Sequence, residues 1–102
     1  MATTAILTVN YTDNQLVAYL NGAQVYNRIG GGEAINEQVV LTGNLQAGVN
    51  QLLLVCVNFG GPAHAQGSVN INGRSQDFNF DTRRDDAPQG IVTQFYYAID
   101  NS

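Results

Sequence analysis

The sequence predicts an all-β fold: a single domain over residues 1–102, built as an antiparallel β-sandwich (jelly roll) of about eight strands. Two observations carry this prediction. Short runs of alternating apolar residues recur at intervals of roughly ten residues, and clusters of Gly, Asn, Asp and Pro separate them. No segment has the apolar spacing of an amphipathic helix. Short strands separated by turn signals are typical of two packed antiparallel sheets.

The first part of the chain contains three predicted strands. They lie at residues 5–11, 15–20 and 23–26. The first alternates apolar and polar side chains and is rich in β-branched and aromatic types, which favours a half-buried strand. A turn is predicted around Asp13 and Asn14, because both side chains can bond to their own backbone. Asn21-Gly22 is a strong short-hairpin signal between the second and third strands.

Three consecutive glycines at residues 30–32 come next. A phosphate-binding loop would need a helix after the glycines and a lysine, and both are missing, so this segment predicts a flexible connection between two sheets. Residues 38–41 then form a short fourth strand.

The most apolar run of the chain, residues 52–57, predicts a strand at the centre of a sheet. Six apolar residues follow one another, far fewer than the ~20 that cross a bilayer. Turn formers stand on both sides, so a strand of ordinary length fits between them. Because the run is apolar on both of its sides, we expect both sides to be covered. Cys56 lies inside it and is expected to be a buried, unreactive thiol.

The second half of the chain alternates loops and strands. A loop of small residues at 60–67 carries the only histidine, His64, and a highly charged loop lies at residues 81–89. Three further strands are expected at residues 68–71, 74–80 and 90–100. Asn72-Gly73 joins the first two of them by the same hairpin chemistry as Asn21-Gly22.

Charge and targeting features restrict the class of function. The formal net charge is −4, lysine is absent, and the four arginines form no basic stripe, which argues against nucleic-acid binding. No basic segment followed by an apolar segment stands at the start, so no signal peptide is expected. The predicted location is therefore the cytoplasm, with non-classical release as a route outward. A single cysteine allows no internal disulfide, which agrees with a reducing compartment.

Catalysis is not expected from this composition. The chain has one histidine, no lysine and no nucleophile-elbow motif, and a sandwich of this size rarely has a cleft that could hold a distorted sugar. For metal binding, Asp81, Asp85 and Asp86 are candidate calcium ligands, because they place carboxylates close together in the sequence. Arg83 and Arg84 stand among them and repel a cation, so a surface loop with local Asp–Arg pairs is the competing interpretation.

Sugar binding needs polar groups that exchange hydrogen bonds with vicinal hydroxyls, usually beside an aromatic ring. The candidate ligand-binding residues, from two loops, are Asn58, His64, Gln66, Arg83, Arg84 and Asp85. The candidate aromatic platforms are Tyr11, Tyr26, Tyr96 and Tyr97, for which packing within the sandwich is the alternative role. Whether the two loops share one end of the sandwich depends on strand order, which the sequence leaves open.

Two stretches of the chain resemble a known family. They are Asp13-Asn14 with Val17, Tyr19-Leu20-Asn21-Gly22 and Val25, and Leu45-Gln46-Ala47-Gly48-Val49-Asn50 continuing through the central run to Asn58-Phe59-Gly60-Gly61-Pro62-Ala63. Together they resemble galactose-binding-domain-like jelly rolls, the non-catalytic modules attached to many glycoside hydrolases. This resemblance covers residues 11–63 and implies the fold and a sugar ligand. Its Asn-Gly and Gly-x-Asn turns are requirements of the backbone.

A weaker likeness is to the small galactophilic lectins of bacteria. Those lectins hold calcium and sugar with a loop rich in Asp, Asn and Thr, placed after the strand that corresponds to residues 52–57. The matching loop here, residues 60–67, contains no carboxylate.

Two hypotheses of function follow. The first is a non-catalytic, lectin-like carbohydrate-binding protein that recognises sugars through loops at one end of the sandwich. Lectins of this size gain avidity by association, so a homo-oligomer, either a dimer or a tetramer, is expected. The alternative is a structural or assembly module that self-associates or binds a protein partner without any small ligand. Low charge density and long strands favour that alternative.

Overall fold

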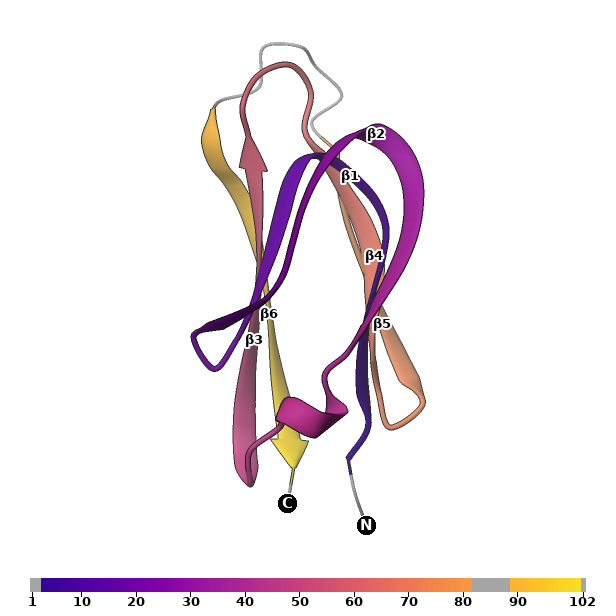
Figure 1. Cartoon of the computed structure of the whole chain (residues 1–102), viewed down its shortest axis with the longest axis vertical. Helices are drawn as coiled ribbons and strands as arrows, with labels where there is room; N and C mark the ends of the chain where they lie inside the picture. Colours follow the sequence, from indigo (N-terminus) through magenta and orange to yellow (C-terminus); the bar gives the residue numbers. More distant parts are fainter. Residues whose placement is uncertain (1–2, 82–88, 102) are drawn as a thin grey trace.

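The computed structural model describes residues 3–81 and 89–101 and confirms the all-β antiparallel fold (Figure 1). In chain order the elements are β1 (Ala5–Leu20), β2 (Ala23–Val40), the 3₁₀ turn η1 (Thr42–Asn44), β3 (Gly48–Asn58), β4 (His64–Ile71), β5 (Arg74–Asp81) and β6 (Gly90–Asn101). None of the described residues belongs to a helix with the length and apolar character needed to span a membrane.

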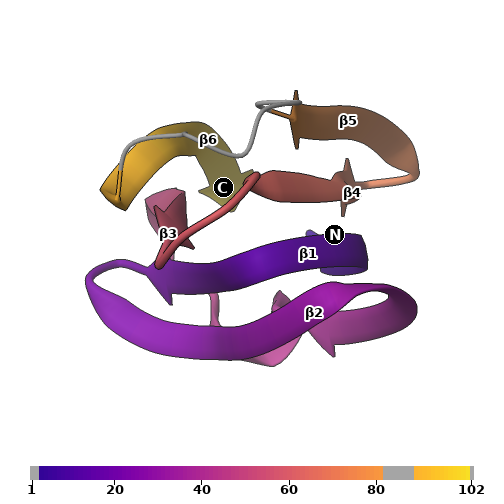
Figure 2. The ribbon, with the colours of Figure 1, turned by 90° about the horizontal axis from the view of Figure 1, so that it is seen from above.

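The strands form one curled sheet whose two halves face each other as layers (Figure 2). The order is β5-β4-β1-β3-β6, and β2 pairs along the remaining edge of β1. Residues 5–13 of β1 pair with β4, whereas residues 15–20 of the same strand pair with β3. We therefore distinguish a β4–β5 layer and a β3–β6 layer, each completed by one half of β1 and one half of β2.

The sandwich is established by these pairings, and the jelly-roll connectivity is not. A jelly roll contains Greek keys, in which a strand returns by a long connection to lie beside the first. Among residues 3–81 and 89–101, β4 does return to lie beside β1, but β2 and β3 do not pair with each other, so three successive hairpin-connected strands are not present. That finer part of the prediction is therefore unconfirmed.

Within the described residues, the eight expected strands appear as six, because two of the expected breaks are paired. The turn predicted around Asp13 and Asn14 lies inside β1, and the glycines expected to form a flexible connection lie inside β2. These two segments pair with each other, Asp13 opposite Gly31 and Asn14 opposite Gly30. A Cβ on Gly30 would collide with the backbone and side chain of Thr12, so close approach of the strands requires glycine here. Long-range pairing overrides the local turn preference.

Both Asn-Gly hairpins are confirmed by their backbone angles. Asn21 and Asn72 have φ of 51° and 53°, and the glycine after each has φ of 84°. The loop predicted at residues 60–67 is shorter than expected, because β4 already begins at His64. His64 pairs with Asp13 on one side and with Asp81 on the other, which extends the strand at its N-terminal end.

The core lies between the inner faces of the two layers. β3 is central in its layer, between β1 and β6, and its inner side chains Leu52, Leu54 and Cys56 are fully buried. Across the sandwich, the rings of Phe78 and Phe95 pack with centroids 5.2 Å apart. The prediction that the central strand is covered on both sides holds only in part: on its outer side Val55 is buried, whereas Leu53 and Val57 are partly exposed.

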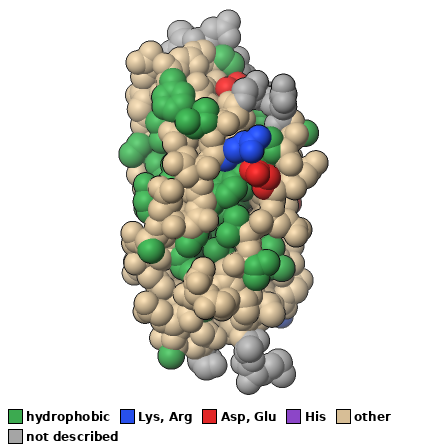
Figure 3. All heavy atoms as spheres, viewed as in Figure 1, with side chains coloured by type: hydrophobic (Ala, Val, Ile, Leu, Met, Phe, Trp, Pro, Cys, Tyr) green, Lys and Arg blue, Asp and Glu red, His purple; other side chains and the backbone are tan. Residues whose placement is uncertain are grey.

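The edge formed by β2 carries a polar contact between the two layers. Arg28 and Glu37 form an ion pair of 3.4 Å, and the Tyr26 hydroxyl donates a 2.7 Å hydrogen bond to the same carboxylate. Figure 3 views the molecule from the β2 side: a basic and an acidic side chain meet there, with apolar side chains between the layers below them. These contacts tie the two halves of β2 together.

Candidate functional site

The two segments predicted to bind ligand meet at one end of the sandwich. Asn58 pairs with Gly90, and His64 pairs with Asp81, so β3, β4, β5 and β6 all end or begin there (Figure 1). The question of whether these segments share an end is thereby answered. Residues 82–88 lie outside the described part of the chain, and the following predicted site residues are among them: Arg83, Arg84, Asp85 and Asp86.

His64 lies in a row of polar residues across the outer face of the β4–β5 layer. Asp13 of β1 is its neighbour on one side and Asp81 of β5 its neighbour on the other. Thr12 precedes Asp13 in β1, Ala65 follows His64 in β4, and both are fully buried on the inner side. Because successive side chains of a strand point to opposite sides, the row itself faces outward.

The next row adds an aromatic ring and two amides. Gln66 lies two residues after His64 and therefore on the same face, between Tyr11 of β1 and Asn79 of β5. The rings of Tyr11 and His64 are in contact, with centroids 4.1 Å apart and planes tilted by 42°. Both Gln66 and Asn79 are exposed. We call these two rows the polar cluster: Tyr11, Asp13, His64, Gln66, Asn79 and Asp81.

The polar cluster has the chemistry that neutral polar ligands require. A carboxamide both donates and accepts hydrogen bonds, and a carboxylate accepts several, so vicinal hydroxyls can be bound in pairs. The Tyr11–His64 pair offers ring surface to the C–H groups of a ligand. Of these residues, the sequence predicts His64 and Gln66 as candidate ligand-binding residues and Asp81 as a candidate metal ligand, and these roles stay predictions. It missed Asp13 and Asn79, because only the strand register brings them beside the others.

Asn58 has a structural role in this geometry. Its side chain is 1% exposed. Its Oδ1 accepts hydrogen bonds from the Asn14 side chain (2.9 Å) and the Gly60 backbone (3.2 Å), and its Nδ2 donates to the Gly61 carbonyl (3.1 Å). These bonds fix the turn after β3, as Asn50 fixes the turn before it. Its predicted contact with a ligand stays a prediction that burial does not favour.

The other candidate platforms lie elsewhere. Tyr26 is bonded to Glu37 at the β2 edge, and burial, followed by that hydrogen bond, raises the pKa of its hydroxyl. Tyr97 packs against the core, where burial and then the Asp77 carboxylate raise its pKa. Tyr96 lies on the outer face of the other layer, with 59% of its surface exposed.

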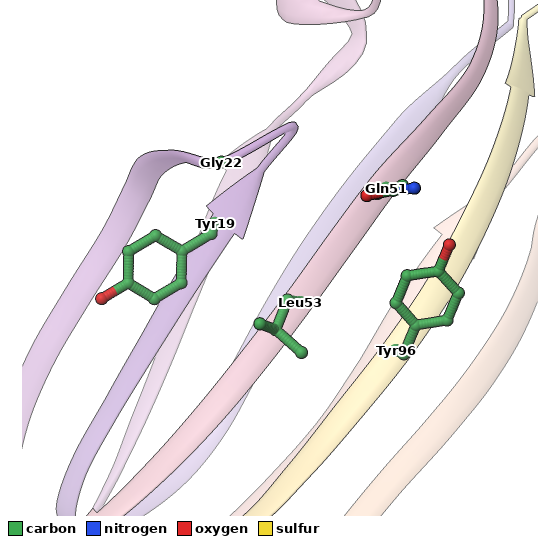
Figure 4. A pocket seen from close by; sticks show the side chains of 5 residues that line it. All are labelled: Tyr19, Gly22, Gln51, Leu53 and Tyr96. Atoms are coloured by element: carbon green, nitrogen blue, oxygen red, sulfur yellow. The ribbon is translucent and has the colours of Figure 1, made fainter.

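That other outer face carries a shallow depression of about 390 Å³. It is lined by Tyr19, Gly22, Gln51, Leu53 and Tyr96. Figure 4 shows Leu53 between the two tyrosine rings. Gln51 is the only carboxamide in the lining, and the other side chains are the two tyrosine rings and Leu53. The exposed surface of this lining is mainly apolar, and with one amide it offers fewer hydrogen-bonding groups to a polyhydroxylated ligand than the polar cluster does.

Metal binding has no site in the described residues. Within 3–81 and 89–101, no three His, Cys, Asp or Glu side chains are grouped so as to hold an ion. Of the predicted calcium ligands, Asp81 belongs to the polar cluster, whereas Asp85 and Asp86 lie outside the described residues. The calcium hypothesis therefore stays a prediction.

Fold and cluster together define a class: a two-layered antiparallel β-sandwich with a polar cluster on one outer face. Comparisons with known proteins add no narrower assignment. No family model matches the chain, and no curated protein or solved structure matches it significantly.

Proposed function

We propose that this chain is a non-catalytic, lectin-like carbohydrate-binding protein, and that the polar cluster on the β4–β5 layer is its sugar site. The supporting observation is the convergence of the Tyr11–His64 ring pair with exposed Gln66 and Asn79 on one face. Ring surface beside amide groups is the combination that neutral sugars need, because a sugar has apolar C–H faces and hydroxyls at its rim.

The resemblance to galactose-binding-domain-like modules supports the same proposal. It concerns the fold, and a fold by itself does not establish a ligand. The polar cluster supplies what the resemblance lacks, namely specific side chains with the required chemistry. Two of its members, His64 and Gln66, are adjacent on the outer side of β4, so a ligand that contacts one can reach the other.

A glycan array probed with labelled protein, in calcium buffer and again with chelator, tests the proposal. We expect bound glycans in at least one buffer. Binding that survives chelation identifies direct recognition by the polar cluster, whereas binding lost in chelator assigns the calcium role to Asp81, Asp85 and Asp86. A silent array in both buffers, with the protein folded by circular dichroism, contradicts the proposal.

Substitutions locate the site among the exposed amides. Gln66→Ala is expected to weaken binding of a positive glycan about tenfold, the effect of losing one or two hydrogen bonds to the ligand. Gln76→Ala is the matched control, since Gln76 is also an exposed glutamine, in neighbouring β5, but pairs with inward-facing Val69 and so lies on the opposite side of the layer from the polar cluster. Equal losses from both variants would place the sugar site elsewhere.

A further inference from the structure

The outer face of the β3–β6 layer carries exposed apolar side chains that the proposed sugar site does not use. Strand register arranges it in successive rows across β2, β1, β3 and β6. The three complete rows are Ile29–Gln15–Val57–Ile91, Asn27–Val17–Val55–Gln94 and Gln24–Tyr19–Leu53–Tyr96. We call these rows the apolar outer face.

Large apolar side chains concentrate on this face. Ile29 is 65% exposed, Ile91 62% and Tyr96 59%, and Val49 lies at the lower margin on the same side of β3. Val17 and Val55, in the middle of the face, are already buried by their neighbours, and the exposed apolar side chains stand around them on β2, β6 and the start of β3. Exposed apolar surface of this kind marks an interaction site.

The size of the face suits a protein partner. The three rows, together with the next outward positions of β3, Gln51 and Val49, measure about 19 Å across four strands and about 27 Å along β3, with Asp100 at the far margin. Two such faces together remove roughly 1,000 Å² from water, the lower limit for a specific interface.

Charge and hydrogen-bonding chemistry select a second copy of this chain as that partner. The protein carries a formal net charge of −4, so copies repel one another wherever their charges meet. The three rows contain no charged residue, and Asp100 stands beside Val49, beyond them. The polar residues that flank the apolar centre are amides, among them Gln24, Asn27 and Gln94. An amide donates and accepts at once and therefore complements its own copy.

We propose that two copies of this chain pack face to face through the apolar outer face, with Tyr19, Leu53 and Tyr96 near the centre of the interface. An isologous contact of this kind uses the same surface on both copies and closes as a dimer. Apolar side chains at the centre and amides around them match the anatomy of protein interfaces. The polar clusters then lie on the two outer sides of the dimer, pointing away from each other, where they can bind two ligands at once.

Sedimentation velocity and light scattering over a wide range of concentrations test this proposal, with three variants compared with the wild-type chain. Tyr96→Asp and Ile29→Asp each place a carboxylate in the face twice per dimer, and we expect each to raise the dimer dissociation constant by about a hundredfold or more. Both positions are exposed, so the monomer is expected to fold, as circular dichroism and thermal unfolding will show.

Val40→Asp is the matched control. Val40 is a β-branched residue of the same strand as Ile29 and is 64% exposed, but it pairs with Ile6 in the β4–β5 layer. We expect this variant to remain a dimer with an unchanged dissociation constant. A wild-type chain that stays monomeric at high concentration overturns the proposal and leaves the face to a different protein. An equal effect from Val40→Asp and Ile29→Asp also overturns it. Glycan binding is measured separately, so either proposal can fail alone.

Discussion

The outer faces of the two layers differ although the same strands build both. On the β4–β5 layer, the outward side chains of β4 and β5 are all polar: His64, Gln66, Ser68, Asn70, Ser75, Asp77, Asn79 and Asp81. On the β3–β6 layer, the outward side chains of β3 and β6 include Leu53, Val55, Val57, Ile91 and Tyr96. The contrast shows that apolar character continues onto the outer side of this layer, where Val55 is buried, Leu53 and Val57 are partly buried, and Ile91 and Tyr96 stay exposed.

The inner faces, by comparison, are alike. Leu7 and Val9 in one layer and Leu16 and Leu20 in the other belong to β1 and to one continuous core. Because β1 and β2 pass through both layers, the layers differ in surface chemistry but share their stability. Both proposals concern the outer faces, where we place the ligand and the second copy. The inner faces hold the sandwich together.

The largest expected effect tests whether the layers are one cooperative unit. Asn50 is fully buried at one end of β3. Its amide donates to the carbonyls of Gln46, Gly48 and Ile99 and accepts from Gln46 and Asn21, at distances of 2.8–3.3 Å. Asn50→Ala leaves these buried groups unpaired, so we expect the free energy of unfolding to fall by about 3 kcal/mol and Tm by roughly 15 °C.

Thermal unfolding of Asn50→Ala, followed by circular dichroism and by hydrogen exchange in both layers, measures this effect. One transition is expected, with β4 and β5 exchanging together with β3 and β6. Asn10→Ala is the control, because Asn10 makes one exposed hydrogen bond to Asn36 and should change stability by less than about 0.5 kcal/mol. Separate transitions for the two layers would mean that the layers differ in stability as well as in the chemistry of their outer faces.

A second, smaller effect concerns the inner side of β3, beneath the apolar outer face. Burial, and then the nearby Asp13 carboxylate, raise the pKa of the Cys56 thiol to about 11. The unfolded chain loses this proton near pH 8.5, whereas the folded chain keeps it. The contribution of the thiol is therefore fully present below about pH 8.5 and is lost as pH rises through about 11, by on the order of 3 kcal/mol.

Urea unfolding at a series of alkaline pH values, with wild type and Cys56→Ala compared, isolates the thiol from the tyrosines that also ionise there. The variant should lose a methylene-sized contact at every pH, about 1 kcal/mol, but its stability should decline less steeply above pH 9. If the stabilities of wild type and Cys56→Ala decline in parallel above pH 9, water reaches the thiol in the folded chain. The inner side of β3 would then not be dry.

Much of this architecture could be predicted from the sequence, because alternation and turn chemistry are local. Both Asn-Gly hairpins and the central position of β3 followed from a few residues each. The unbroken course of β1 through Asp13 did not, since it depends on pairing with glycines far along the chain. The site divides in the same way. His64 and Gln66 share a face by their spacing alone, whereas Asn79 joins them only through the register of β5.

The smallest expected effect lies at the β2 edge, between the two outer faces. Arg28 and Glu37 leave 43% and 39% of their side chains exposed, so solvent screens their ion pair and its contribution is at most about 0.5 kcal/mol. Glu37→Gln removes the charge but keeps an acceptor for the Tyr26 hydroxyl. We expect almost unchanged stability in urea, and a Tyr26 pKa that falls yet stays above its usual value, because burial is the larger cause of its shift.

Ultraviolet titration of tyrosine ionisation in wild type and Glu37→Gln checks this, with Tyr26→Phe identifying the signal. A loss of 2 kcal/mol or more in Glu37→Gln would mean that the polar contact, and not the shared core, keeps the two layers together. The free energy of the sandwich would then depend on its edge, and the outer faces could change their relative position when that contact breaks. A negligible loss assigns the alignment of the layers to β1 and β2 themselves, because both strands continue from one layer into the other.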